Sequence, residues 1–97
     1  MNKLPSENTL RLLEAYHEFP GEYTFKIIGP NGQEWQDAIR QAASGVLGDV
    51  GKCLQVSNHS RQGTYQSLTL TVHVESSQMV LKIYAALQKV PGVKMLV

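Results

Sequence analysis

The stretch Tyr65-Gln-Ser-Leu-Thr-Leu-Thr-Val-His-Val74 decides the fold of this chain. Aliphatic residues stand at every second position from residue 68 onward, and the positions between them are polar. This period of two predicts a β-strand over residues 64–75, with one buried face and one face open to solvent. The predicted inward face holds Leu68, Leu70, Val72 and Val74, and the open face holds Tyr65, Ser67, Thr69, Thr71 and His73.

On both sides of this strand the apolar spacing becomes helical. Residues 33–47 carry one apolar stripe, which predicts an amphipathic helix. A second helix is predicted over 77–90, capped by Ser76 or Ser77 and stopped by Pro91-Gly92. The first stripe consists of Trp35, Ala38, Ile39, Ala42, Ala43, Val46 and Leu47, and the second of Val80, Ile83, Tyr84 and Leu87.

Three further strands complete the pattern. Residues 22–28 alternate, with Tyr23, Phe25 and Ile27 on one face. A weaker strand is predicted over 52–58, and a last strand over 93–97. The order β-α-β-β-α-β predicts an α+β, ferredoxin-like sandwich, with a four-stranded antiparallel sheet and both helices on one face. Strands 52–58 and 93–97 are the expected sheet edges. A short leading helix is predicted over 7–17, capped by Ser6 and ended by Pro20-Gly21.

The length of 97 residues fits a single domain spanning 1–97, with residues 1–20 as an N-terminal extension. Hydrophobic residues make up 42% and charged residues 18% of the chain, which is typical of a soluble globular protein. The N-terminal residues contain no continuous apolar stretch of 7–15 residues, so no secretory signal is expected, and no apolar run reaches membrane-spanning length. The single cysteine excludes an internal disulfide. These features predict a cytoplasmic protein.

The net charge of +1 combines an acidic first half with a basic second half. Residues 1–49 carry four Lys or Arg against seven Asp or Glu, and residues 50–97 carry five against Glu75 alone. A basic half can attract phosphates, so weak nucleic-acid or nucleotide binding is one alternative. The cations are scattered, however, and an RNA-recognition domain would need aromatic side chains in the middle of the open strand face. The favoured interpretation is that the cations of residues 50–97 lie on solvated surfaces.

No motif predicts catalysis, a metal site or a cofactor. The glycines between Gly45 and Lys52 follow a helix and lack the P-loop spacing, and the three histidines lack metal-ligand spacing. Cys53 is predicted to be a buried, inert thiol in the strand 52–58. An acylphosphatase-like hydrolase on the same fold stays open as an alternative, because Asn58 and Arg61 are close in sequence.

The turn between the strands 52–58 and 64–75 is the candidate binding site. It combines a cation, hydroxyls, an amide and a glycine, which could hold an anion or the backbone of a partner. The alternative is a turn made by its glycine with a solvated arginine. The candidate residues are Ser60, Arg61, Gln62, Gly63, Tyr65 and Ser67.

Four stretches together resemble the YbeD-like family of small uncharacterised bacterial proteins. This resemblance runs from about residue 12 to the end of the chain and implies a ferredoxin-like fold similar to the ACT-type regulatory domains of amino-acid metabolism. The family has no established activity. The stretches are Glu18-Phe-Pro leading into Phe25-Lys-Ile-Ile-Gly29, Ser60-x-x-Gly63-x-Tyr65-x-Ser67, Ser67-Leu-Thr-Leu-Thr-Val72, and Leu87-Gln-Lys-Val-Pro-Gly-Val-Lys-Met-Leu-Val97.

The sequence therefore predicts a small regulatory or interaction module without catalytic activity. Its partner would be an unknown protein or small molecule, with no membrane contact. An exposed edge strand would also allow a homodimer, because unpaired strand edges invite pairing.

Overall fold

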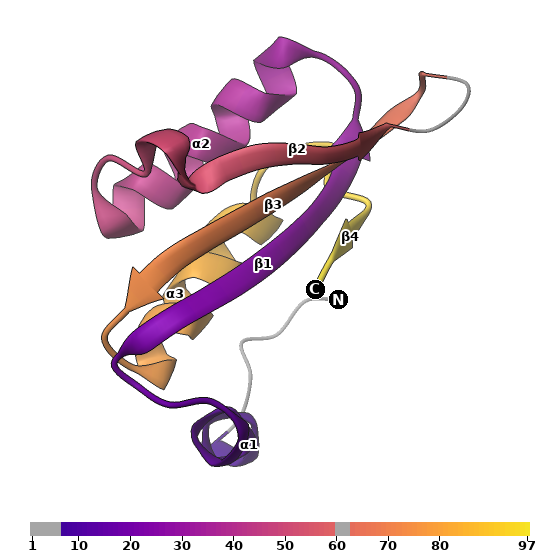
Figure 1. Cartoon of the computed structure of the whole chain (residues 1–97). Helices are drawn as coiled ribbons and strands as arrows, with labels where there is room; N and C mark the ends of the chain where they lie inside the picture. The colour runs from indigo at the N-terminus through magenta and orange to yellow at the C-terminus, as the bar shows by residue number, and fades with distance from the viewer. Residues whose placement is uncertain (1–6, 60–62) are drawn as a thin grey trace.

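Strand β3 (Tyr65–Val74) lies in the middle of a four-stranded sheet, as its alternating sequence predicts. The computed structural model describes residues 7–59 and 63–97. The strand order is β2-β3-β1-β4, and all neighbouring strands are antiparallel, which is the predicted ferredoxin-like arrangement (Figure 1). The remaining elements are α1 (Glu7–Tyr16), β1 (Gly21–Pro30), α2 (Gln33–Leu47), the 3₁₀ turn η1 (Gly51–Cys53), β2 (Leu54–His59), α3 (Ser77–Gln88) and β4 (Met95–Leu96).

Strands β1 and β3 form the longest ladder of the sheet. Their register runs without a shift from Gly21 opposite Val74 to Pro30 opposite Tyr65. The predicted inward side chains of β3 are buried, and so is Gln66, which the sequence pattern did not predict. The Gln66 amide donates to the carbonyl oxygens of Pro30 and Gly32, at 3.1 and 2.9 Å, and accepts from Gln36. These bonds satisfy a polar group inside the core.

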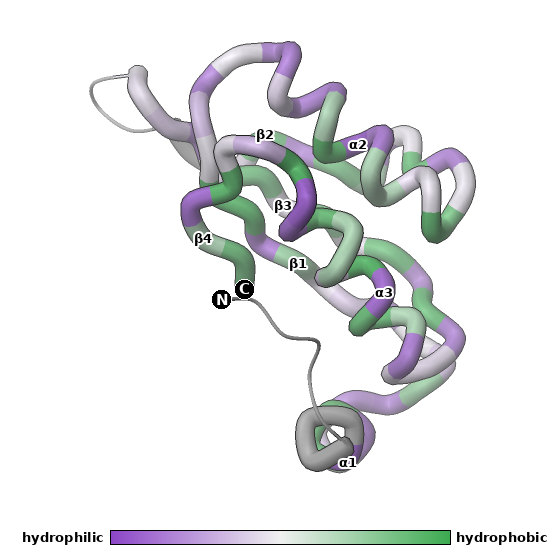
Figure 2. Tube along the Cα trace, turned by 180° about the vertical axis from the view of Figure 1, so that it is seen from behind, coloured by the Kyte–Doolittle hydropathy of each residue, from purple (hydrophilic) through white to green (hydrophobic). Residues whose placement is uncertain are grey.

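Helices α2 and α3 both cover the inward face of the sheet, where they lie across β1 and β3 (Figure 2). Helix α2 has the predicted bounds, and Trp35, Ile39 and Ala43 of its stripe are buried. Helix α3 begins after Ser76, whose hydroxyl accepts a hydrogen bond from the Met79 amide, as the predicted cap requires. It ends at Gln88, two residues earlier than predicted.

Gly29 and Trp35 show why a glycine stands near the end of β1. A Cβ atom at Gly29 would lie 2.1 Å from Cζ2 of Trp35, because the indole ring lies directly on the glycine backbone. Only glycine permits this approach, and the approach allows Trp35 to be buried in the core.

The edge strands are β2 and β4, as predicted, but both are shorter than expected. Strand β2 begins at Leu54, which takes the inward position opposite Leu70. Cys53 therefore precedes the ladder, in η1, and its side chain is exposed. The prediction of a buried thiol in a strand is wrong for this reason. Strand β4 contains only Met95 and Leu96, whereas the sequence predicted a strand over 93–97.

Helix α1 is seen end-on beside the start of β1 in both views, away from α2 (Figures 1 and 2). The hydroxyl of Ser77, on α3, donates a 2.9 Å hydrogen bond to the Glu14 carboxylate of α1. The predicted cap of this helix, Ser6, lies outside the described residues. Within the described part of the chain, no helix is long and apolar enough to cross a membrane.

Candidate functional site at the outer edge of β1

The short β4 leaves part of the central strand β1 at the edge of the sheet. Strand β4 pairs with Ile27 and Ile28. Beyond it, Lys26 and Val97 exchange two main-chain hydrogen bonds of 3.0 and 2.9 Å. No described residue pairs with β1 beyond this point on this side, so the segment 21–25 pairs with β3 on one side and with no described strand on the other, its open edge.

The main-chain groups of Glu22 and Thr24 point to this open edge. In an antiparallel ladder, alternate residues direct their N–H and C=O to opposite neighbours. Lys26 directs its N–H and C=O away from β3, toward Val97. Because the β1 register has no shift, Thr24 and Glu22 also direct their N–H and C=O away from β3. Among the described residues, no hydrogen bond to these four outward groups is formed. They are available to an incoming strand.

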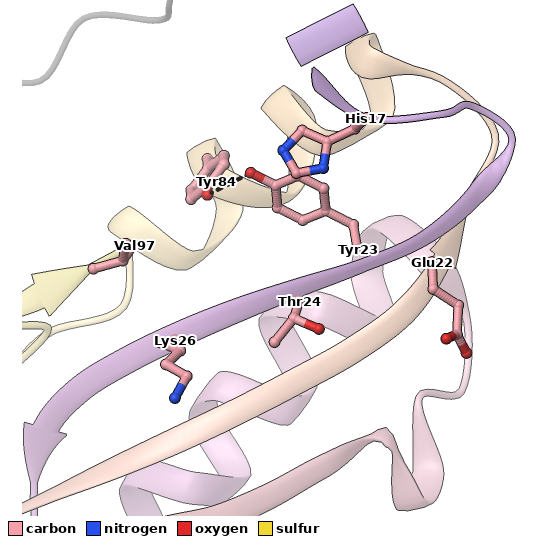
Figure 3. Close-up of a pocket in the computed structure, with 7 residues that line it drawn as sticks. All are labelled: His17, Glu22, Tyr23, Thr24, Lys26, Tyr84 and Val97. Atoms are coloured by element: carbon pink, nitrogen blue, oxygen red, sulfur yellow. Dashed lines mark hydrogen bonds between the residues drawn. The ribbon is translucent and has the colours of Figure 1, made fainter. Parts of the chain in front are cut away.

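A groove of about 550 Å³ follows this open edge. Val97 lies at one end and His17, just after α1, at the other (Figure 3). The strand divides the lining into two walls, because successive side chains point to opposite faces. Tyr23, with Tyr84 and His17, forms the wall on the helix side, and the exposed side chains of Glu22, Thr24 and Lys26 form the wall on the open face.

The helix-side wall is an aromatic cluster. The hydroxyls of Tyr23 and Tyr84 lie 3.2 Å apart, and the Tyr23 ring makes tilted contacts with Phe25 and His17, at centroid distances of 4.8 and 4.9 Å. Burial, and to a smaller extent the hydrogen bond with Tyr23, raises the pKa of the Tyr84 hydroxyl above its ordinary value. Each ring therefore presents an apolar surface with a hydrogen-bonding hydroxyl at its tip.

The open-face wall is polar and charged. The Thr24 hydroxyl lies 3.0 Å from that of Thr71 on β3, which is consistent with the close spacing of a pair without main-chain bonds. Lys26 and Glu22 stand on either side of Thr24 on the same face. Within the described chain, neither forms an ion pair, so both charges are available to a bound segment.

The predicted hairpin site lies at the opposite end of the β1–β3 ladder. Ser60, Arg61 and Gln62 are outside the described residues. Gly63 has a φ of 68°, a left-handed conformation that suits glycine in a turn. Its carbonyl accepts a 2.9 Å hydrogen bond from the Asn31 side chain.

The two remaining hairpin residues contact other side chains of the open sheet face. The Tyr65 hydroxyl accepts a hydrogen bond of 3.1 Å from the Lys94 ammonium, which also lies 4.8 Å from the ring centroid. The Ser67 hydroxyl lies 3.2 Å from that of Ser57. Tyr65 and Ser67 thus belong to the strand β3, and none of the three described site residues, Gly63, Tyr65 and Ser67, lines the β1 groove.

The sequence did not predict the β1 groove, because the hydrogen-bonding groups along its open edge are main-chain N–H and C=O groups. The alternation of residues 22–28 predicted the strand and placed Tyr23 on its inward face. It carried no signal that β4 would contain only Met95 and Leu96, opposite Ile28 and Ile27. No group of three or more His, Cys, Asp or Glu residues within the described part of the chain is arranged to hold a metal ion.

Comparison with known proteins tests the resemblance found in the sequence. The family described as "Protein of unknown function (DUF493)" matches residues 14–97. The chain belongs to this family. The matched region includes every residue that lines the β1 groove. The YbeD-like resemblance is thereby confirmed, and the DUF493 description assigns no activity.

Three curated relatives of this DUF493 chain are all called UPF0250 protein. One from Haemophilus influenzae strain PittEE is 34% identical over 92 residues, which cover 94% of this chain and 97% of the relative. One from Shewanella piezotolerans is 33% identical over 78 residues, covering 79% and 85%. One from Pasteurella multocida is 32% identical over 79 residues, covering 80% and 86%. The function therefore has to be argued from the site.

Proposed function

We propose that this protein is a non-catalytic interaction module that binds an extended segment of a partner protein along the outer edge of β1. The observation that supports this proposal is the pair of residues Glu22 and Thr24, whose outward N–H and C=O groups have no hydrogen-bond partner among residues 7–59 and 63–97 and lie beside a groove. An exposed strand edge is a template for β-strand addition, in which main-chain hydrogen bonds supply affinity and side-chain pockets supply specificity.

The edge of β1 suits this role better than the edge of β2. The ladder between β2 and β3 shifts its register between Val56 and Asn58. The Ser57 hydroxyl at this irregularity donates a hydrogen bond of 3.0 Å to the Ser67 carbonyl. Bulges of this kind interrupt pairing along an edge strand. Segment 21–25 has a continuous register instead and already lies beside a groove.

The groove also limits the size of the bound segment. Val97 closes one end and His17 the other, so the open edge accepts about five residues of extended chain (Figure 3). Helix α1, which stands beside the start of β1, restricts the approach of a second complete sheet (Figure 1). A single extended strand fits these limits.

Selection from a library of random displayed heptapeptides tests this function. We expect the wild-type chain to select peptides that no longer bind Thr24→Pro. Proline removes the outward N–H of residue 24 and leaves the hydrogen bonds between β1 and β3 untouched, because this N–H does not take part in them.

Thr24→Ala is the matched control, since it loses the same hydroxyl but keeps the N–H. It should bind the selected peptides like the wild type. Circular dichroism would establish that both variants are folded. Selected peptides that bind Thr24→Pro and Thr24→Ala equally well would contradict the proposal, as would the absence of any selected peptide.

The homodimer through an edge strand stays a prediction. Strands β2 and β4 are the terminal strands of the sheet, and Val56 on β2 is 41% exposed. Light scattering over a wide concentration range would test it, and a constant monomer mass at high concentration would exclude it.

A further inference from the structure

We infer that the segment bound at the β1 groove runs antiparallel to β1 and carries an acidic residue, an aliphatic residue and a basic residue in that order. The inference rests on the proposed function, and it specifies the sequence that the edge would recognise. It follows from the register of β1 and from the side chains on the two walls of the groove.

The direction follows from the pairing already present at this edge. Strand β4 is antiparallel to β1, and Val97 forms a doubly bonded pair with Lys26. A guest that continues this line places one residue opposite Thr24, the next opposite Tyr23 and the third opposite Glu22. The first and third residues then form doubly bonded pairs, for a total of four main-chain hydrogen bonds.

The middle guest residue points to the helix-side wall. It lies opposite Tyr23, so its side chain shares the face of the Tyr23 and Tyr84 rings and approaches His17. Contacts between aromatic and β-branched side chains across strands are favourable. A valine or isoleucine therefore suits this position.

The first and third guest residues point to the open face, where Lys26 and Glu22 decide their charge. A residue opposite Thr24 is diagonal to Lys26 on one side and to Glu22 on the other, and long side chains reach across such diagonals. A basic residue directly opposite Glu22 matches that carboxylate, which leaves Lys26 to attract an acidic side chain in the first position. A residue opposite Glu22 faces its carboxylate directly. Across β3, Glu22 is opposite His73, which lies 3.3 Å from Glu75. The Lys26 ammonium and the Glu22 carboxylate therefore favour an acidic side chain in the first guest position and a basic side chain in the third.

Two synthetic peptides with the same composition test the inference. The first is acetyl-Glu-Val-Lys-Val-amide, and the second is acetyl-Lys-Val-Glu-Val-amide, in which the charges are exchanged. Titration of the folded protein, followed by the NMR shifts of the Glu22 and Thr24 amides, should show tighter binding of the first peptide. We expect a preference of about fivefold, because solvent-exposed pairs contribute little individually and two of them change sign.

The protein variant with Glu22→Lys and Lys26→Glu should reverse this preference, because both walls then carry the opposite charge. Equal binding of the two peptides to the wild type, or an unchanged preference in the double variant, would overturn the inference and leave strand addition intact. If neither peptide shifts the Glu22 and Thr24 amides at millimolar concentration, the proposed function fails together with the inference.

Discussion

The hydroxyls of Tyr23 and Tyr84 lie 3.2 Å apart, although 61 positions separate them in the chain. Tyr23 comes from β1 and Tyr84 from α3, so this contact joins the sheet to a covering helix beside the β1 groove. The Tyr84 ring also meets Phe25 edge-on, with 4.9 Å between the ring centroids. The contact thus connects the core to the groove wall.

The raised pKa of Tyr84 predicts a loss of stability at alkaline pH. Its hydroxyl ionises near pH 10 in the unfolded chain and at a higher pH in the folded one. Above about pH 10 the unfolded state therefore binds fewer protons than the folded state, and the free energy of unfolding falls as pH rises. Urea unfolding between pH 7 and pH 11 should show this fall.

The control is Tyr84→Phe, which removes the titrating group. It should lose about 1 kcal/mol of stability at pH 7 with the hydrogen bond, and its unfolding free energy should depend less on pH above 10. An identical alkaline slope in both proteins would assign the effect to other groups.

Gly29→Ala should be strongly destabilising. Its methyl group would lie 2.1 Å from Cζ2 of Trp35, so the buried indole would have to move. We expect a loss of about 3 kcal/mol, in the range of overpacked cores, measured by urea denaturation with Trp35 fluorescence. Gly45→Ala is the matched control, because Gly45 is an exposed helical glycine with no heavy atom near the added Cβ. It should gain about 0.5–1 kcal/mol, and similar effects of the two substitutions would contradict the packing argument.

Ser76→Ala should destabilise α3. The Ser76 hydroxyl accepts a hydrogen bond of 3.3 Å from the Met79 amide, and its removal leaves that donor without its cap. Losses at such positions are typically about 1 kcal/mol. Thermal unfolding should show a lower Tm for Ser76→Ala, and Ser76→Asp, which keeps a capping oxygen, should lie close to the wild type. Equal Tm values for all three proteins would show that the cap does not stabilise the helix.

Cys53 should react with a thiol reagent in the folded protein. Its side chain is exposed in η1, ahead of the first paired residue of β2. Titration with Ellman's reagent under native conditions should modify this single thiol at nearly the rate seen in urea. A rate slower by two orders of magnitude would mean that the thiol is protected.

The strand and helix assignments could be predicted because the hydrophobic period is strong. The alternation from Leu68 to Val74 admits only one buried face, and the stripe of α2 matches its observed bounds. The position of the cap was predicted to within one residue, as Ser76 or Ser77, and the structure assigns it to Ser76. Errors occurred where local patterns are weak, as at Cys53 and β4. There the pairing partner, rather than propensity, decides where a strand begins or ends.

The candidate site also has a part that the sequence predicted and a part that it did not. The hairpin residues Gly63, Tyr65 and Ser67 were predicted as a site from their residue types. In the structure Gly63 makes a turn, and Tyr65 and Ser67 contact other side chains on the open face of the sheet. The groove residues Glu22 and Thr24 have no distinctive residue type, since their contribution comes from the backbone. The types of their side chains could not have predicted that these two residues border a groove.

The sequence by itself determined which segments form strands and helices, and which face of each is buried, because hydrophobic periodicity is a local property. It also determined the family and the antiparallel sandwich. Only the tertiary structure decided that β4 contains just Met95 and Leu96, opposite Ile28 and Ile27, and that α1 lies beside the start of β1. Both depend on packing between distant segments. Among the described residues, four backbone groups of Glu22 and Thr24 are left without a partner beside the groove.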